Sequence, residues 1–267
     1  TPTVGKAVEQ FSQEFQRPRG LYIAYPDRDH IEEIIENRFN SEVDIIVMTD
    51  GAGVLGIGDQ GIGGRDICIV KSMVYVLCGG VNPSRLLPIQ IDVGTDNEQL
   101  LNDTMYLGWR HPRISGKEYD DMVERVVLAI QRKLPQAYLH WEDFGRENAR
   151  RNLERYHQQM CTFNDDMQGT GAVTLVALLS AITRTKVPLT EQRIVIVGAG
   201  TAGTGIADQL CAAMRREGLS QQEALSRFYL VGRHGLLHQA MPELTAFQKP
   251  YARSDLAETG TNLSLHE

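Results

Sequence analysis

Residues 193–203 read Arg-Ile-Val-Ile-Val-Gly-Ala-Gly-Thr-Ala-Gly, and the fold class follows from this stretch. The apolar run predicts a buried strand, and the three glycines predict a tight turn that opens a helix. Gly198 allows the turn, Gly200 lets a pyrophosphate approach the backbone, and Gly203 lets the helix pack on the strand. The pyrophosphate would then lie against the unpaired N–H groups of the helix N-terminus. The stretch predicts dinucleotide binding, for which the alternative is a plain strand–turn–helix corner.

The chain after this turn continues the same βαβ pattern. A helix is expected over 205–216 and a second strand over 227–231. A NAD-binding unit normally ends that second strand with an acid that binds the ribose 2′-hydroxyl. This chain has Gly232, Arg233 and His234 there, which would tolerate a 2′-phosphate. NADP is therefore an alternative to NAD.

Two acidic pairs lie upstream of the glycine turn. Glu142-Asp143 ends an apolar run, and Asp165-Asp166 follows a short helical stretch. Side chains of adjacent strand residues face opposite ways, but at the end of a strand, where the chain turns, both can reach one ion. Asp166 could add a third carboxylate, and a hard oxygen site of this kind suits Mn²⁺ or Mg²⁺. The alternative for each pair is a solvated turn.

Lys71 is the one charged residue between Asp66 and Arg85, in a segment from Cys68 to Cys78 that predicts a buried helix. A lysine so placed either extends its amine to the surface or is buried with a depressed pKa. In the second case it becomes a candidate general base. The sequence spacing leaves both alternatives open.

The remaining pattern predicts an α/β fold of two parts. Strands are expected over 20–25, 43–48, 87–93 and 137–141, and helices over 4–15, 29–38, 119–134 and 169–185. We predict an N-terminal α/β catalytic domain with a parallel sheet over 1–167. A partial Rossmann-type dinucleotide-binding domain is expected over 168–267.

Composition excludes several classes of protein. The net charge of -7 and the pI near 5.6 argue against nucleic-acid binding, for which a basic face is expected. No apolar run reaches the length of a membrane span, and the first residues do not form a secretory signal. The four widely spaced cysteines predict reduced, mostly buried thiols in a cytoplasmic protein.

Taken together, these segments resemble the malic enzyme family, including its malolactic branch. The motifs that carry the resemblance span nearly the whole chain and occur in the family's order: Thr1-Pro-Thr-Val-Gly, Gly56-Ile-Gly-Asp-Gln-Gly, Asn82-Pro-Ser-Arg-Leu-Leu-Pro, Ile91-Asp-Val-Gly-Thr-Asp-Asn, Trp141-Glu-Asp-Phe-Gly, Thr162-Phe-Asn-Asp-Asp-Met-Gln-Gly-Thr and Val197-Gly-Ala-Gly.

The resemblance implies oxidative decarboxylation of L-malate to pyruvate and CO₂ with NAD(P)⁺ and a divalent cation. Hydride leaves C2, oxaloacetate loses CO₂, and the resulting enolate is reprotonated. It implies that Lys71 is the catalytic base, that Asp165 supports the site, and that Thr170 contacts the cofactor. Glu142, Asp143 and Asp166 match the metal ligands, and the three glycines match cofactor contacts. The family also suggests a homo-oligomer, a dimer or a tetramer.

Three departures from the family pattern keep alternatives open. The family's catalytic tyrosine directly precedes the motif that begins at Thr1, and the C-terminal part of the family's dinucleotide domain is missing, so we expect the chain to be truncated at both ends. Gly53 replaces a substrate-binding arginine of many malic enzymes, as in malolactic enzymes, which release L-lactate and CO₂ while NAD stays bound. Val70 replaces a glycine before the lysine. Besides a malic enzyme and a malolactic enzyme, the third alternative is a non-catalytic nucleotide-binding homologue.

Overall fold

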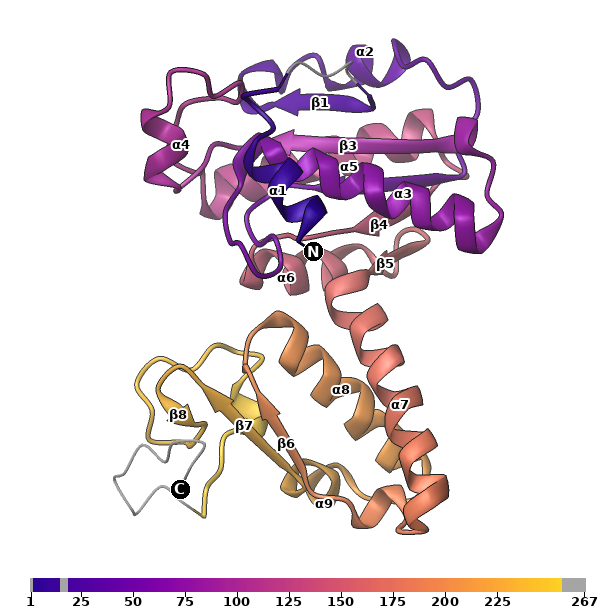
Figure 1. Ribbon diagram of the computed structural model, residues 1–267, viewed down its shortest axis with the longest axis vertical. Helices are drawn as coiled ribbons and strands as arrows, with labels where there is room; N and C mark the ends of the chain where they lie inside the picture. The colour runs from indigo at the N-terminus through magenta and orange to yellow at the C-terminus, as the bar shows by residue number, and fades with distance from the viewer. Residues whose placement is uncertain (1, 15–18, 256–267) are drawn as a thin grey trace. The chain divides into compact units, whose positions relative to one another are not determined.

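The computed structural model describes residues 2–14 and 19–255 (Figure 1). The chain divides into two compact units, Thr1–Asn164 and Asp165–Glu267. Each unit combines helices with a sheet that contains parallel strands, so the predicted α/β class is confirmed.

The first unit contains a five-stranded parallel sheet in the order β1-β3-β2-β4-β5. Its central strands are almost completely buried, which explains why the sequence shows continuous apolar runs there instead of alternation. The strands are β1 (Leu21–Ala24), β2 (Ile45–Thr49), β3 (Leu86–Asp92), β4 (Tyr138–Trp141) and β5 (Thr162–Asn164).

Helices connect these strands and cover the sheet. The helix α1 packs against α3, and α2 packs against α5. The helices of this unit are α1 (Thr3–Glu9), α2 (Ile31–Glu36), α3 (Arg65–Gly79), α4 (Glu98–Asn102), α5 (Gly116–Lys133) and α6 (Arg146–Tyr156), with short turns η1 (Tyr25–Asp27), η2 (Gly61–Gly64) and η3 (Pro83–Arg85).

The strand order places a topological switch point between β2 and β4. From β2 the chain passes through α3 to β3 on one side, whereas from β4 it passes through α6 to β5 on the other. Because such crossovers are right-handed, the connections leave these two neighbouring strands in opposite directions. Open α/β sheets bind ligands at the carboxyl ends of strands at such a point. Glu142 and Asp143 directly follow β4 at this edge.

Two predicted helices of the first unit differ in the structure. The helix expected over 4–15 ends at Glu9, and the chain continues in turns that bring Phe11 into a small cluster with Ile62 and Tyr106. The helix around Lys71 is not buried throughout, because Met73, Val74 and Leu77 on its outer face are exposed. The prediction that the helix is buried on all sides was therefore wrong, although the segment is apolar.

The second unit contains a three-stranded sheet in the order β6-β7-β8. Strands β6 (Ile194–Val197) and β7 (Phe228–Gly232) are parallel, and β8 (Gly235–Leu236) pairs antiparallel with β7. Helix α7 packs against α8, and the core gathers apolar residues such as Leu210, Met214 and Phe228. Its helices are α7 (Thr170–Thr185), α8 (Thr201–Arg216) and α9 (Gln221–Ser226), with η4 (Asp165–Gly169), η5 (Leu189–Glu191) and η6 (Lys249–Tyr251).

All four cysteines are free thiols, as predicted. Cys68 and Cys211 are buried, but Cys78 and Cys161 are exposed, so the expectation of mostly buried thiols holds for half of them. Within the described ranges, none of the helices combines the length and the apolar character that a membrane span requires.

Candidate active site

The acidic pair after β4 directs both of its side chains to one side because the backbone turns at Asp143. This residue has a φ of 53°, in the left-handed region that non-glycine residues rarely adopt. The glycine-rich loop holds the turn: the Gly53 amide donates to the Asp143 carbonyl at 3.0 Å, and the Leu55 amide donates to its Oδ1 at 3.3 Å. Glu142 and Asp143 are both buried. Backbone strain at this point fits a functional site.

The second acidic pair emerges at the same edge of the sheet. Strand β5 is the parallel neighbour of β4, with Trp141 in register with Asn164, so the residues that follow each strand leave the sheet together. Oxygen atoms of Glu142, Asp143 and Asp166 all lie within 4.8 Å of one another, and the three residues are buried. We call these three residues the carboxylate cluster. The structure thus brings the three predicted metal ligands together.

Lys71 on α3 reaches this cluster. Its Nζ lies 3.1 Å from Glu142 Oε1, and its side chain is 32% exposed. The sequence left open whether the amine extends to the surface or turns inward. The geometry places it against a member of the carboxylate cluster, while part of the side chain still contacts solvent. Its role as a base stays a prediction.

His140 also contacts the carboxylate cluster, and the sequence analysis did not select it as a site residue. Its Nε2 lies 2.7 Å from Glu142 Oε2, and its Nδ1 lies 2.7 Å from the Tyr75 hydroxyl. Ligand atoms of His140, Glu142 and Asp165 also fall within 4.8 Å of one another. Strand alternation carried the missing signal, since residues two apart in a strand face the same side.

The glycine turn of the second unit has the close contacts that its sequence predicted. Gly198 has a φ of 108°, and a Cβ on Gly203 would lie 1.8 Å from the Gly198 carbonyl oxygen, so no side chain fits there. Gly200 precedes the first residue of α8, where the helix presents unpaired N–H groups. The turn can therefore receive a pyrophosphate without a steric obstacle from a side chain.

The other predicted cofactor residues lie at element ends of the same unit. Thr170 begins α7, and its hydroxyl donates to the Asp165 carbonyl at 3.3 Å. Arg233 is exposed directly after β7, where a ribose-binding acid would be expected.

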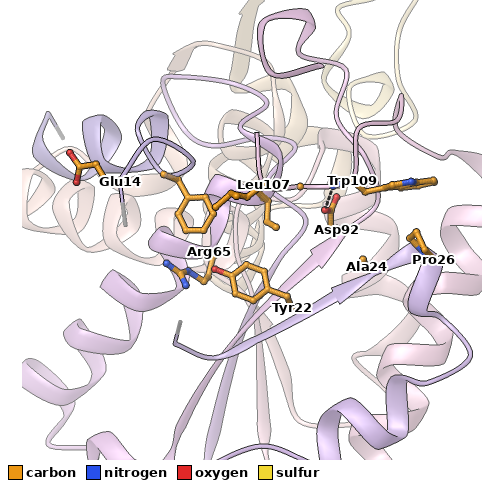
Figure 2. Close-up of a pocket in the computed structure, with 11 residues that line it drawn as sticks. Glu14, Tyr22, Ala24, Pro26, Arg65, Asp92, Leu107 and Trp109 are labelled. Carbon is orange, nitrogen blue, oxygen red and sulfur yellow. Dashed lines mark hydrogen bonds between the residues drawn. The ribbon is translucent and has the colours of Figure 1, made fainter. Parts of the chain in front are cut away.

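A separate cavity of about 530 Å³ lies in the first unit (Figure 2). Arg65 stands over the rings of Phe11 and Tyr22 on its wall, and Asp92 accepts a hydrogen bond from the Trp109 amide at 2.6 Å. Burial raises the pKa of the Asp92 carboxyl, although the amides of Trp109 and Gly94 oppose the shift. Of the predicted site residues that the structure describes, none lines this cavity.

The fold and the site together define an α/β protein whose first unit carries Lys71 in contact with a buried carboxylate cluster. The second unit, described by itself, carries a dinucleotide-type glycine turn. Comparison with known families agrees. Residues 1–157 match the malic enzyme N-terminal domain, and residues 167–267 match the malic enzyme NAD-binding domain. The chain belongs to the malic enzyme family, as its motifs predicted.

Curated relatives of this chain are named NAD-dependent malic enzymes. The NAD-dependent malic enzyme of Erwinia tasmaniensis is 50% identical over 93% of this chain and 44% of its own length. NAD-dependent malic enzyme 3 of Bacillus subtilis is 50% identical over 95% of this chain and 45% of its own. The chain therefore spans about half the length of the curated relatives it matches.

Solved structures share the fold. The malic enzyme of Entamoeba histolytica superimposes with a TM-score of 0.59 at 24% identity, covering 85% of this chain and 40% of its own. The NAD-dependent malic enzyme of Thermotoga maritima gives a TM-score of 0.57 at 19% identity, covering 100% of this chain and 55% of its own.

Proposed function

We propose that the protein carrying this chain converts L-malate to pyruvate and CO₂ with reduction of NAD⁺ to NADH, and that it requires a divalent cation. One observation carries the proposal: three buried carboxylates lie within 4.8 Å of one another, and the amine of Lys71 lies 3.1 Å from Glu142. The names of the curated relatives support the same reaction.

The carboxylate cluster fits a divalent cation. Three ionised carboxylates with one ammonium leave two negative charges in a buried place, which a doubly charged ion balances. Every donor is a hard oxygen, and this favours Mn²⁺ or Mg²⁺ over softer metals. We propose Glu142, Asp143 and Asp166 as its ligands. Such an ion would polarise the oxygen on C2 of malate.

The reaction needs a base, and Lys71 is our proposal for it. Once its amine has released its proton, it accepts the proton of the C2 hydroxyl while the hydride on C2 passes to the coenzyme. Loss of CO₂ from the resulting 2-oxo acid leaves an enolate, which gains one proton to become pyruvate. We propose that Asp165 supports this site from its place directly after β5.

We propose that the coenzyme lies on the second unit, with its pyrophosphate at Gly198, Gly200 and Gly203 and with Thr170 in contact. NAD is the first choice, because the relatives are named for it. Arg233 keeps NADP as an alternative, since its guanidinium could pair with a 2′-phosphate. Comparing the two coenzymes at equal concentration tests this choice.

A second candidate, release of L-lactate with NAD kept bound, is favoured by Gly53. A Cβ at this position would lie 2.8 Å from the Phe144 carbonyl oxygen, so this backbone does not accept a side chain there. An arginine at position 53, which many malic enzymes use for the substrate carboxylate, is therefore excluded from this loop conformation.

A product assay on the whole protein decides between these functions. The protein is incubated with L-malate, Mn²⁺ and NAD⁺ or NADP⁺, and pyruvate, lactate and reduced coenzyme are measured. Pyruvate with reduced coenzyme supports the main proposal, and lactate without it supports the second. If the metal-loaded protein forms neither product, both proposals are wrong, and the non-catalytic nucleotide-binding homologue becomes the better description.

We further propose a homo-oligomer, a dimer or a tetramer, that acts in the cytoplasm on this small molecule without nucleic acid or membrane partners. The acidic net charge of -7 supports the exclusion of nucleic acid. Light scattering on the purified protein and cell fractionation test the assembly and the location.

A further inference from the structure

Tyr75, His140 and Glu142 are linked by hydrogen bonds, and an ion pair connects Glu142 to Lys71. The Tyr75 hydroxyl lies 2.7 Å from His140 Nδ1, His140 Nε2 lies 2.7 Å from Glu142 Oε2, and Glu142 Oε1 lies 3.1 Å from Lys71 Nζ. All four residues belong to the first unit, on α3, on β4 and directly after β4. His140 is buried, and its ring packs edge-on against Tyr75 and Phe163. The ring orientation is therefore held from two sides.

For an ionised Glu142 carboxylate beside a neutral His140 imidazole, the direction of both hydrogen bonds follows. An ionised carboxylate only accepts, so His140 Nε2 carries a proton and donates it to Glu142 Oε2. In a neutral imidazole the other nitrogen is then an acceptor, and the Tyr75 hydroxyl donates to Nδ1. Tyr75 thus selects the tautomer of His140 that can hold Glu142.

The consequence concerns the two oxygens of Glu142. Because Oε2 is held by His140, the carboxylate cannot rotate without breaking a buried hydrogen bond, and Oε1 stays directed at Lys71. We propose that His140 is a positioning residue, which together with Tyr75 fixes the orientation of Glu142 for both the divalent cation and the lysine. This inference rests on the proposed function.

Two other roles for His140 give different results. A histidine that only fills the core would change the stability of the fold and leave cation affinity as it is. A histidine that binds the cation directly is suggested by the second grouping of His140, Glu142 and Asp165. We favour positioning, because the Nε2 atom that would bind a cation is already hydrogen-bonded to Glu142 at 2.7 Å.

The experiment compares variants of the whole protein by Mn²⁺ binding without substrate, followed by the electron paramagnetic resonance of free Mn²⁺. His140→Ala removes the hydrogen bond, and we expect Mn²⁺ affinity to fall about 10- to 100-fold, as is typical when a partner of a metal ligand is lost. His140→Gln places an amide N–H near the position of Nε2 and should restore most of the affinity. His140→Asn, whose amide is one bond shorter, should not restore the Mn²⁺ affinity.

Tyr75→Phe should lower the Mn²⁺ affinity less than His140→Ala does, because the His140 tautomer with a proton on Nε2 can still form. His157→Ala, at an exposed histidine after α6, is the matched control.

Steady-state kinetics and thermal unfolding complete the test. A positioning role predicts that kcat falls in His140→Ala even at saturating Mn²⁺, because Glu142 Oε1 is no longer held toward Lys71, while KM for L-malate changes less. Wild-type Mn²⁺ affinity in His140→Ala, or equal loss in the glutamine and asparagine variants, contradicts the positioning role. A nitrogen coupling in the pulsed spectrum of bound Mn²⁺ would overturn it in favour of a direct ligand. If His140→Ala does not fold, Tyr75→Phe and the Gln/Asn pair still decide. If the wild-type protein neither binds Mn²⁺ nor converts malate, the proposed function itself fails.

Discussion

Arg113 and Asp59 form a bidentate ion pair, in which Nε donates to Oδ2 at 2.8 Å and Nη2 donates to Oδ1 at 2.6 Å. Asp59 lies in the glycine-rich loop between β2 and α3, and the same Arg113 Nη2 also donates to the Asp50 carbonyl at 3.0 Å. The pair therefore ties both ends of this loop to one side chain. Two backbone amides of this loop also donate hydrogen bonds to Asp143, so the conformation of the loop helps to position this member of the carboxylate cluster.

Arg113→Met is expected to destabilise the first unit strongly. The side chains of Arg113 and Asp59 are 11% and 17% exposed, so the substitution leaves a nearly buried carboxylate without its cation. Breaking such a pair costs about 3–5 kcal/mol. Arg125→Met is the control, because Arg125 pairs with Asp29 at the surface and such pairs contribute about 1 kcal/mol or less. Urea unfolding of both variants measures the difference. Equal losses in the two would show that the loop does not depend on the buried pair.

Asp50→Asn is expected to change how stability depends on pH. Burial raises the pKa of the Asp50 carboxyl above its ordinary value of 3.8, although Arg113 and hydrogen bonds from Tyr119 and Ala52 oppose the shift. Because the folded-state pKa is the higher one, its contribution to stability is complete below 3.8 and is lost as the pH rises through the folded-state pKa. The Asp50→Asn variant has no carboxyl group to ionise at this position, so it does not lose this stability as the pH rises.

The measurement is the free energy of unfolding at several pH values from about 3.8 upward, the ordinary pKa of this carboxyl. Relative to the wild type, Asp50→Asn should become more stable as the pH increases through this window. Asp29→Asn, at an exposed carboxylate, provides the control. A difference between Asp50→Asn and the wild type that stays constant with pH argues against the raised pKa.

The sequence predicted the parts of the fold in which one physical signal dominates. Apolar runs located six of the strands, since strands buried in a parallel sheet are apolar on both faces, whereas the short strands β5 and β8 were not predicted. The same rule placed Glu142 and Asp143 at a strand end, and β5 brings Asp166 to the same edge. The glycine spacing located the turn before α8, where Gly198 has a φ of 108° and a Cβ on Gly203 would lie 1.8 Å from the Gly198 carbonyl oxygen.

What the sequence could not predict depends on neighbours distant in the chain. The register of β4 with β5 and the left-handed backbone of Asp143 are set by pairing and by the loop around Gly53, not by local preference. The bond from Tyr75 to His140 joins residues 65 positions apart. The interpretation of α3 as wholly buried was wrong because hydropathy does not show which face of an apolar helix is covered.

Gly203→Ala is expected to reduce coenzyme binding and the stability of the second unit together. The new Cβ would lie 1.8 Å from the Gly198 carbonyl oxygen, so either the turn or the start of α8 must move. Overpacking of this kind costs about 1–3 kcal/mol. Gly232→Ala is the matched control for stability, because its Cβ would meet its nearest neighbour, Leu237, at an ordinary 3.5 Å. Calorimetric NAD titration and thermal unfolding of the whole protein test both effects. Wild-type NAD affinity in Gly203→Ala would show that the pyrophosphate does not lie on this turn.

Mn²⁺ is expected to stabilise the wild-type protein, and Asp166→Asn should abolish this effect. A ligand that binds the folded state alone adds about 2.7 kcal/mol at a concentration 100 times its dissociation constant. The variant removes one of the three buried carboxylates, so it loses a cation ligand and also relieves charge repulsion within the cluster. Without metal, Asp166→Asn should therefore be at least as stable as the wild type, and with Mn²⁺ it should be the less stable of the two. This reversal separates a metal site from a structural carboxylate, whose loss would destabilise the protein under both conditions.

Thermal unfolding with Mn²⁺ and with a chelator measures the reversal. Asp121→Asn on α5 is the control, because Asp121 pairs with the exposed Lys117. An equal Mn²⁺ response in Asp166→Asn and the wild type would remove Asp166 from the ligand set.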